Sequence, residues 1–282
     1  MPLVSTAELV SAAVADHRGV AAFNVITLEH AEAIAAGAEA AGAPAILQIS
    51  ENAVKFHGGT LSAIAAATAA VARASGAPLA LHLDHVVSAE LMRAADGEGF
   101  SSVMFDASKL SYDENVAATA DAVRWGRERG IWIEAELGKV GGKEGEAPLD
   151  AHAPGVRTDP AEAAAYTAAT GVDALAVAVG SSHAMTERTA ALDHALITRL
   201  RDAVPVPLVL HGSSGVPDTE IRAAIGAGMV KINVGTALNT AFTGAVREFL
   251  TANPSTVDPR KYLAPARTAM AATVAGFLGL VN

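Results

Sequence analysis

The sequence contains no cysteine. This excludes a disulfide framework, a thiolate nucleophile and a thiolate metal site. Charged residues are also few, at 18% against 51% hydrophobic residues, which is not the composition of a disordered chain. Positive charge is in deficit, and the net charge of −10 argues against a general nucleic-acid-binding surface. It does not exclude an anionic substrate, because a site can be locally positive within an acidic protein.

Long apolar runs and linkers are absent as well. No run reaches the ~20 residues that span a bilayer, so we expect no membrane segment. The N-terminal stretch has no basic region, and Glu8 and Asp16 interrupt its apolar residues, so it predicts a first helix and not a signal peptide. Together with the lack of cysteine, this favours a cytoplasmic protein. No segment rich in proline or serine divides the chain, and residues 1–282 are predicted to form a single domain.

Short apolar runs alternate with longer amphipathic stretches throughout the chain. The near-continuous apolarity of the short runs is typical of parallel strands covered on both faces. Eight strands are predicted at 20–25, 43–50, 78–84, 101–106, 131–137, 172–180, 207–211 and 229–234. Helices are predicted near 29–42, 59–75, 88–98, 113–129, 159–170, 193–203, 217–227 and 237–252. This pattern predicts an α/β fold, a (β/α)8 TIM barrel with an N-terminal helix and a C-terminal helical extension.

A polar residue lies near the end of every predicted strand, where a buried apolar strand has no structural need for one. These residues are Asn24, Ser50, Asp84 with His85, Asp106, Glu136, His183, His211 and Asn233. The active site of such a barrel lies at the carboxyl ends of its strands. The pattern therefore predicts an active site to which all eight strands contribute.

Three of the nine histidines share this placement at the end of a strand, namely His85, His183 and His211. Three imidazole ligands leave an open position on Zn²⁺, which a catalytic metal needs. A single histidine is more often structural, and His82, one register earlier on its strand, is expected in the core or orienting a ligand. The shared placement predicts one metal site formed by the three histidines.

Asp84 directly precedes one of these candidate ligands. It could cap the turn or orient His85. It could equally move a proton, because a neighbouring cation lowers the pKa of a carboxyl group and keeps it ionised. The residues by themselves leave both roles open.

Two loops of small residues follow the seventh and eighth predicted strands, HGSSG at 211–215 and NVGT at 233–236. Small residues let backbone N–H groups approach an anion, and a helix N-terminus adds its positive dipole. Barrels frequently bind phosphate at these two loops. Gly212, Ser214, Asn233 and Thr236 are the candidates for this site.

Residues 138–157 form a long segment rich in glycine and charge after the fifth predicted strand. Loops of this length are often functional, and glycines on both sides give hinge freedom, so we predict a mobile active-site loop. Glu144 and Glu146 are either solvated charges or, in the sharper interpretation, the source of a carboxylate that the loop brings over the metal.

Taken together, the motifs resemble those of the class II, metal-dependent ketose-bisphosphate aldolases, which include fructose- and tagatose-bisphosphate aldolases. The motifs are AFN at 22–24, LHLDH at 81–85, EAELGxxGGxE at 134–144, LAVAVGxxH at 175–183, PLVLHGxSG at 207–215, KINVGT at 231–236 and DPRKYL at 258–263. They occur in order over nearly the whole chain. The resemblance implies reversible cleavage of a ketose 1,6-bisphosphate to dihydroxyacetone phosphate and glyceraldehyde 3-phosphate through a zinc-stabilised enediolate, as in glycolysis and related carbohydrate metabolism.

The resemblance also implies roles for individual residues around the metal. His85, His183 and His211 match the ligands of one catalytic Zn²⁺ per subunit. Glu136 matches a nearby carboxylate that serves as an alternative ligand.

The proton-transfer and substrate-binding roles follow from the same resemblance. Asp84 matches the acid/base at the C4 hydroxyl, and Glu144 matches the loop carboxylate that exchanges a proton on the dihydroxyacetone phosphate carbon. Arg260 matches an arginine that reaches the second phosphate, within one subunit or across a subunit boundary. Contacts with substrate are implied for Asn24, Ser50, Gly212, Ser214, Asn233, Gly235, Thr236 and Arg260.

Two positions depart from the family pattern. Ala184 stands where the family has glycine after the second histidine, which puts in question the contact with a monovalent cation, Na⁺ or K⁺, at that backbone. Gly145 stands where the family has aspartate in the loop. The resemblance otherwise implies a homodimer or homotetramer with a sugar-phosphate substrate, and no nucleic-acid or membrane partner.

Three other functions remain open at the level of sequence. A Schiff-base aldolase needs a lysine inside the barrel, and Lys231 is the plausible candidate. A metal-dependent hydrolase barrel commonly has a His-x-His pair on its first strand, where this chain has AFN. A catalytically silent sugar-phosphate-binding barrel would need neither Asp84 nor Glu144. A dihydroxyacetone phosphate aldolase for an inositol- or sulfosugar-derived substrate is a further alternative within the family.

Overall fold

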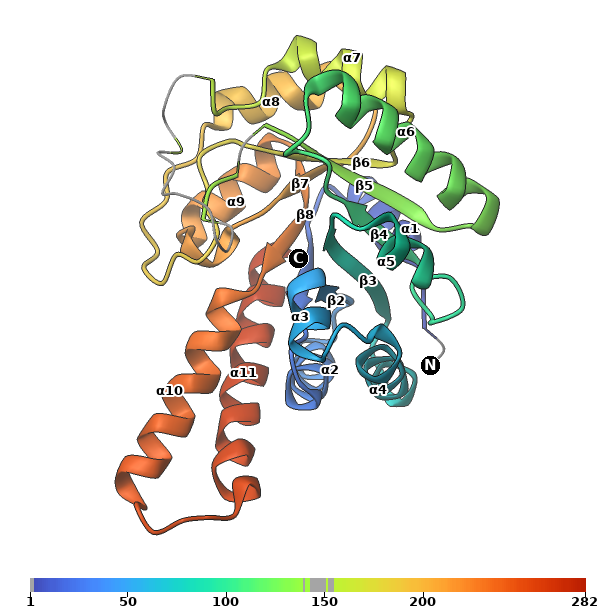
Figure 1. Ribbon diagram of the computed structural model, residues 1–282. Helices are drawn as coiled ribbons and strands as arrows, with labels where there is room; N and C mark the ends of the chain where they lie inside the picture. Colours follow the sequence, from blue (N-terminus) through green and yellow to red (C-terminus); the bar gives the residue numbers. More distant parts are fainter. Residues whose placement is uncertain (1–2, 139, 143–150, 152–154) are drawn as a thin grey trace.

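The computed structural model describes residues 3–282 except 139, 143–150 and 152–154. Eight parallel strands close into a barrel in chain order, with β1 paired to β8 (Figure 1). The strands are β1 Val20–Asn24, β2 Ala45–Ser50, β3 Leu79–Val86, β4 Ser102–Phe105, β5 Trp132–Leu137, β6 Ala174–Val177, β7 Leu208–Leu210 and β8 Met229–Val234. The predicted (β/α)8 barrel is therefore confirmed.

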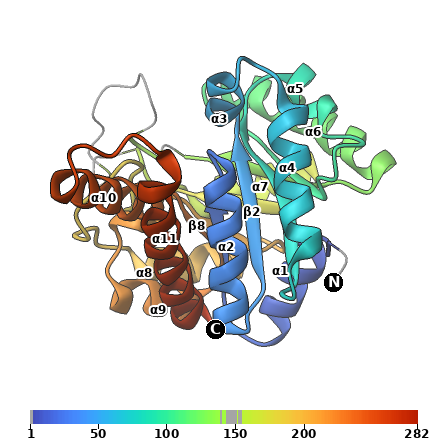
Figure 2. The same cartoon turned by 90° about the horizontal axis from the view of Figure 1, so that it is seen from below.

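Helices cover the outside of the barrel (Figure 2). They are α1 Thr6–Ala15, α2 Leu28–Ala41, α3 Glu51–Phe56, α4 Leu61–Ala74, α5 Ala89–Ala94, α6 Tyr112–Arg129, α7 Pro160–Thr170, α8 His194–Ala203, α9 Asp218–Ala227, α10 Thr236–Ala252 and α11 Pro259–Val281. The sequence did not predict α3, because six residues are too few to show a helical period. Ser50 begins this helix by accepting a hydrogen bond from the Ala53 backbone N–H at 3.2 Å.

The interior of the barrel changes from apolar to polar along its axis. Side chains two residues apart on a strand point to the same side, so the residues two and four positions before Ser50 and Asp84 also face inward. At the amino ends this face carries Ala80 and Ile46, which pack with Leu9 and Val10 of α1. The predicted N-terminal helix thus closes the bottom of the barrel, and polar side chains are left to the opposite end.

A hairpin formed by α10 and α11 extends away from the barrel (Figure 1). Leu238 near its base is the one buried residue of α10, whereas α11 packs along α2 and buries Met270, Val274 and Phe277 in the main core. Figure 2 shows α11 beside α2. The predicted C-terminal helical extension is confirmed.

Among the described helices, α11 has the length and mean hydropathy, 1.3, of a membrane span. The sequence contains no uninterrupted apolar run of that length here, because Arg260, Lys261 and Arg267 interrupt the first half of the helix. The apolar residues of its second half pack against the barrel, as they do in the core helix of a compact protein.

Candidate active site

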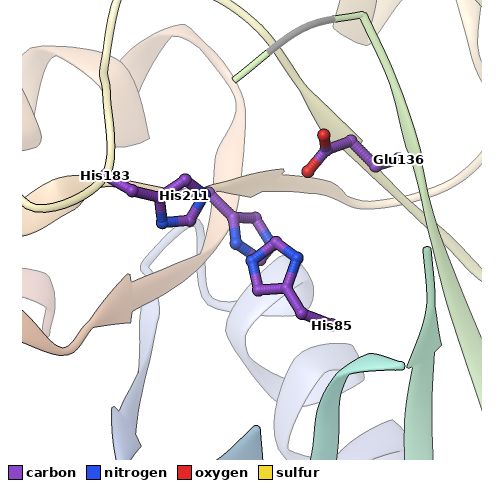
Figure 3. Close-up of side chains that lie close together, drawn as sticks. All are labelled: His85, Glu136, His183 and His211. Carbon is purple, nitrogen blue, oxygen red and sulfur yellow. The ribbon is translucent and has the colours of Figure 1, made fainter. Parts of the chain in front are cut away.

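The three predicted histidine ligands meet at the carboxyl ends of β3, β6 and β7. One nitrogen each of His85, His183 and His211 and a carboxylate oxygen of Glu136 all lie within 4.8 Å of one another. Figure 3 shows the three rings gathered together and the Glu136 carboxylate facing them from β5. Imidazole and carboxylate groups are a donor set that suits zinc, and the cluster has the composition of a single metal site.

His85 is oriented by a second carboxylate. Its Nδ1 lies 3.0 Å from Asp106 Oδ2, and its buried Nε2 has no hydrogen-bond partner within the described part of the chain. Burial disfavours a charge on this ring, but the charge of Asp84 and the hydrogen bond to Asp106 outweigh it and raise the pKa of His85 to about 9. The surroundings therefore favour a positive charge at this position, and Nε2 is oriented to bind a cation.

His183 lies in the loop after β6, and its position is fixed by the base of the 138–157 segment. Its backbone N–H donates to the Gly141 carbonyl oxygen at 2.7 Å. Gly142 has a φ of +78°, and a Cβ there would lie 2.3 Å from the His183 carbonyl oxygen. The close approach therefore requires glycine. The next residue along, Ala184, has a φ of +58°, a left-handed conformation that a Cβ disfavours.

His211 follows β7 and is almost completely buried, with 1% of its surface exposed. Its Nε2 lies 3.0 Å from Glu134 Oε1, and the Asn233 amide nitrogen lies 3.1 Å from Nε2 and 3.3 Å from Nδ1. Burial lowers the pKa of this ring to about 4 despite the neighbouring carboxylate. The ring is thus held neutral, which is the form that binds a metal.

Asp84 lies on β3 beside the metal cluster, with 2% of its surface exposed. Burial alone would raise the pKa of its carboxyl group, but the positive charge favoured at His85 and the nearby His82 bring it well below the usual range. His82 Nε2 lies 3.7 Å from Asp84 Oδ1. The carboxylate form, which can accept a proton, is therefore favoured beside the candidate metal.

These side chains open into a cavity of about 900 Å³ at the carboxyl end of the barrel. Most of the sequence-predicted residues line it: Asn24, Ser50, Asp84, His85, Asp106, His183, His211, Gly212, Ser214, Asn233, Gly235 and Thr236. A pocket of this size with convergent polar groups suits a small polar ligand. Glu136 adjoins the cavity as part of the metal cluster.

The predicted phosphate-binding loops come together on one side of this cavity. Ser214 Oγ accepts a hydrogen bond from the Ala237 backbone N–H at 3.0 Å, which joins the loop after β7 to the N-terminus of α10. Gly212 has a φ of +71°, and a Cβ there would lie 2.5 Å from the Ser182 carbonyl oxygen. The N-terminus of a 17-residue helix and a loop of small residues therefore face the same space, as in many anion sites.

Two predicted residues are not placed in the cavity. Arg260 begins α11 at the far end of the hairpin, where its side chain is 88% exposed and pairs with Asp258 at 2.8 Å. Glu144 and Gly145 lie outside the described residues, as does most of the predicted 138–157 loop. Of this loop, the described Arg157 donates to the backbone oxygens of Ala151 and Val179 at 2.7 and 2.8 Å.

The structure also adds residues that the sequence did not single out. Gln48 Nε2 donates to Asn24 Oδ1 at 2.8 Å, which leaves the amide nitrogen of Asn24 to face a ligand. Glu51 accepts hydrogen bonds from the Val87 and Ser88 N–H groups at 2.8 and 3.3 Å and so holds the segment after His85. Lys55 and Lys109 also line the cavity.

Below the cavity lies a second layer of buried polar residues, Gln48, His82, Glu134 and Lys231. Each stands two positions before a residue of the active-site layer, and this spacing was the available signal in the sequence. Lys231 has no exposed surface, and its Nζ lies 2.8 Å from Glu134 Oε2. A lysine committed to a buried ion pair is poorly suited to attack a substrate carbonyl, which disfavours the Schiff-base alternative.

Comparison with known proteins agrees with this arrangement. Residues 4–282 match the family described as fructose-bisphosphate aldolase class-II. The chain is 41% identical over 277 residues to a fructose-bisphosphate aldolase of Geobacillus stearothermophilus, covering 98% of this chain and 96% of that protein. It is 39% identical over 291 residues to a fructose-bisphosphate aldolase of Thermus caldophilus, covering 95% and 94%.

A solved structure extends the likeness to three dimensions. The crystal structure of the YdjI aldolase from Escherichia coli K12 superimposes with a TM-score of 0.85 at 31% identity, covering 99% of this chain and 97% of that one. A family match over almost the entire chain, and relatives at about 40% identity over nearly their full length, leave one assignment. The chain belongs to the class-II fructose-bisphosphate aldolase family.

Proposed function

We propose that this protein is a zinc-dependent class II aldolase, a carbon–carbon lyase that reversibly cleaves fructose or tagatose 1,6-bisphosphate to dihydroxyacetone phosphate and glyceraldehyde 3-phosphate. One observation carries the proposal. His85, His183, His211 and Asp84 converge in a single cavity that also contains the joined loops after β7 and β8. A metal site, a proton acceptor and an anion site within one cavity are the parts that this reaction needs.

His85, His183 and His211 would hold the ion, with Glu136 as an alternative ligand. The orphaned Nε2 of His85 and the neutral His211 ring both fit a bound cation. When bound, zinc supplies Lewis-acid stabilisation of the negative charge that forms on the oxygens of the substrate.

Two carboxylates, Asp84 and Glu144, carry out the proton transfers. Asp84 removes the proton of the C4 hydroxyl, the C4 oxygen forms the aldehyde carbonyl, and the C3–C4 bond breaks with its electron pair left on C3. Glu144 of the 138–157 segment then protonates C3 of the enediolate, which gives dihydroxyacetone phosphate. The low pKa of Asp84 keeps it in the carboxylate form, which has a free site for a proton, at neutral pH.

The remaining residues of the site bind the two ends of the substrate. Asn24 and Asn233 contact the dihydroxyacetone portion, and Gly212, Ser214, Gly235 and Thr236 hold its phosphate through backbone N–H groups and hydroxyls. Ser50 faces the second phosphate. Binding of a monovalent cation, Na⁺ or K⁺, beside the first phosphate depends on whether the backbone and Cβ of Ala184 leave room for the ion.

Arg260 reaches the second phosphate from a neighbouring subunit. Its exposed position at the end of the α10–α11 hairpin is distant from the cavity of its own chain, which favours the intersubunit alternative over the intrasubunit one. The proposed assembly is a homodimer or homotetramer, and the proposed location is the cytoplasm.

The test is cleavage of fructose 1,6-bisphosphate and tagatose 1,6-bisphosphate side by side, with EDTA and after the return of zinc. We expect dihydroxyacetone phosphate from at least one sugar, loss of its formation with EDTA and recovery with zinc. The faster sugar identifies the C4 configuration that the site prefers. If the zinc-loaded protein cleaves neither, the substrate is another ketose phosphate or the barrel only binds its ligand.

A further inference from the structure

The second polar layer contains a charged pair that the proposed reaction does not use. Glu134 on β5 and Lys231 on β8 lie on strands that are not neighbours in the barrel, and neither side chain has exposed surface. Their Oε2 and Nζ atoms lie 2.8 Å apart. Charges are costly to bury, and a pair placed inside a barrel needs a reason beyond stability.

The reason lies with the other carboxylate oxygen of Glu134, Oε1. Oε2 faces Lys231, while Oε1 lies 3.0 Å from Nε2 of His211, one of the proposed zinc ligands. A carboxylate accepts hydrogen bonds and cannot donate them, so the proton in this contact is placed on Nε2 of His211.

The other nitrogen of His211 is then left with its lone pair. The Asn233 amide nitrogen lies 3.1 Å from Nε2 and 3.3 Å from Nδ1, so it does not distinguish the two ring nitrogens, and the Glu134 contact alone decides between them. Nδ1 is thereby assigned as the atom that faces the metal. A partner on the far nitrogen of a metal-bound imidazole is known to fix both its tautomer and its ring orientation.

We propose that the Glu134–Lys231 ion pair is a positioning device for the metal site, in which Lys231 fixes the Glu134 carboxylate and Glu134 holds His211 in the Nε2–H tautomer with Nδ1 directed at the ion. The inference rests on the proposed zinc site. It assigns Lys231 a role through Glu134, without contact with substrate.

Paired substitutions test the proposal without leaving a single charge in the barrel. Removal of one partner alone would leave an uncompensated buried charge, whereas replacement of both by residues of similar volume is usually tolerated. Glu134→Leu with Lys231→Met removes the acceptor for His211. Glu134→Gln with Lys231→Met removes the charges but keeps a carbonyl oxygen that can accept from Nε2–H.

The readout is the zinc dissociation constant of the metal-free protein, measured by competition with a chelator and without any sugar. We expect the Leu/Met variant to bind zinc roughly 10–100-fold more weakly than the wild type, the usual effect of losing such a partner. The Gln/Met variant should recover most of that affinity. Asp173→Asn is the matched control, because Asp173 accepts from the Ile133 N–H at 2.8 Å at the opposite end of β5, and it should leave zinc affinity unchanged.

Two results would overturn the proposal. One is zinc affinity in the Leu/Met variant equal to that of the wild type. The other is an equal loss in both double variants, because a missing charge and not a missing acceptor would then be responsible.

A second measurement uses the wild-type protein and does not depend on the variants folding. Nitrogen-15 NMR of the metal-free protein with labelled histidine rings reports the tautomer of each ring, and His211→Asn identifies the His211 signals. A proton on Nε2 of His211 supports the proposal, and a proton on Nδ1 refutes it. If this tautomer is found but wild-type protein binds no zinc, the proposed zinc enzyme fails while the positioning of His211 stands.

Discussion

At the scale of single residues, the protonation of each functional side chain is set by the groups that contact it. His85 and His211 belong to one cluster, yet the pKa of the first is raised to about 9 and that of the second is lowered to about 4. Carboxylates surround His85, whereas burial dominates at His211. Their positions in the sequence predicted that both are metal ligands. Only their contacts in the folded protein show that the two rings differ in pKa.

Asp84→Asn tests the proposed acid/base. The amide has nearly the same shape but cannot accept the C4 hydroxyl proton, so turnover of the preferred ketose bisphosphate should fall roughly 10²–10⁴-fold. Zinc content, measured by atomic absorption on the same sample, should stay at the wild-type level. Turnover close to wild type would exclude Asp84 from the proton-transfer step.

Ala184, like His85, has a left-handed backbone conformation in the site, and its side chain has no polar group that could stabilise it. A non-glycine residue in the left-handed region costs about 1–2 kcal/mol, and Ala184→Gly should therefore raise the free energy of unfolding by about 1 kcal/mol. Chemical denaturation measures the change. Ala36→Gly, at an exposed position inside α2, should do the opposite and lower stability by about 0.5–1 kcal/mol. A loss of stability in both variants would refute the assignment of strain to Ala184.

At the scale of elements, the helices other than α3 were predicted from the sequence, and the packing between them was not. The helices α2 and α11 pack side by side, and their contact passes through Gly37. A Cβ at Gly37 would lie 2.6 Å from both the Ala271 carbonyl oxygen and Val274 Cβ. Nothing in the local sequence of α2 indicates that this position faces a helix from the far end of the chain.

Gly37→Ala should accordingly destabilise the protein by about 1–3 kcal/mol, since overpacking forces α11 away from α2. Gly276→Ala in α11 is the control, because a Cβ there meets nothing within 4 Å. The alanine should instead stabilise the helix by about 1 kcal/mol. Equal effects of the two substitutions on the thermal midpoint would contradict this account of the α2–α11 contact.

The same end of the fold contains a histidine that should make stability depend on pH. His30 at the start of α2 stacks on Phe242 of α10 with ring centroids 5.5 Å apart. Burial lowers its pKa below the usual 6.5, although its contacts with Asn239 and Glu29 oppose the shift. Below pH 6.5 the unfolded chain therefore binds a proton that the folded protein resists, and the free energy of unfolding falls as pH decreases.

His30→Gln removes this titration. The difference in stability between pH 7.5 and pH 5.5, measured by urea unfolding, should be smaller in the variant than in the wild type. Thr27, Glu29, Asn239 and Phe242 are the polar and aromatic neighbours of the ring and are unchanged by the substitution. An unaltered pH dependence would show that His30 does not contribute to it.

At the scale of the whole molecule, the barrel brings the candidate metal ligands together within one chain, but the α10–α11 hairpin places Arg260 away from them. If Arg260 acts across a subunit boundary, each active site takes His211 from one subunit and Arg260 from its neighbour. Arg260→Ala and His211→Ala then remove residues that different subunits supply to the same site. Mixed and refolded together, the two inactive variants should regain cleavage, because one site in each hybrid dimer has both residues intact.

Sedimentation of each variant alone checks that the oligomer still forms. Refolding each variant alone provides the baseline for activity. Failure of the mixture to exceed that baseline, with hybrid oligomers shown to be present, would assign Arg260 to its own subunit or remove it from the site.

The sequence by itself determined the barrel, its closing N-terminal helix and the positions of the metal cluster. Each depends on local order: apolar runs separated by amphipathic stretches, and a polar residue where a run ends. Parallel strands bring all such ends to one face, so their order in the chain was enough to predict that His85, His183 and His211 would meet.

Only the tertiary structure decided which groups hold those residues in place. Glu134 and Lys231 become partners because the barrel closes between them, and their pairing sets the orientation of His211. Ala184 has a left-handed backbone directly after His183, the residue that the base of the 138–157 segment contacts. Contacts of this kind join residues far apart in the chain, and no local pattern specifies them, because their geometry follows from closure of the barrel as a whole.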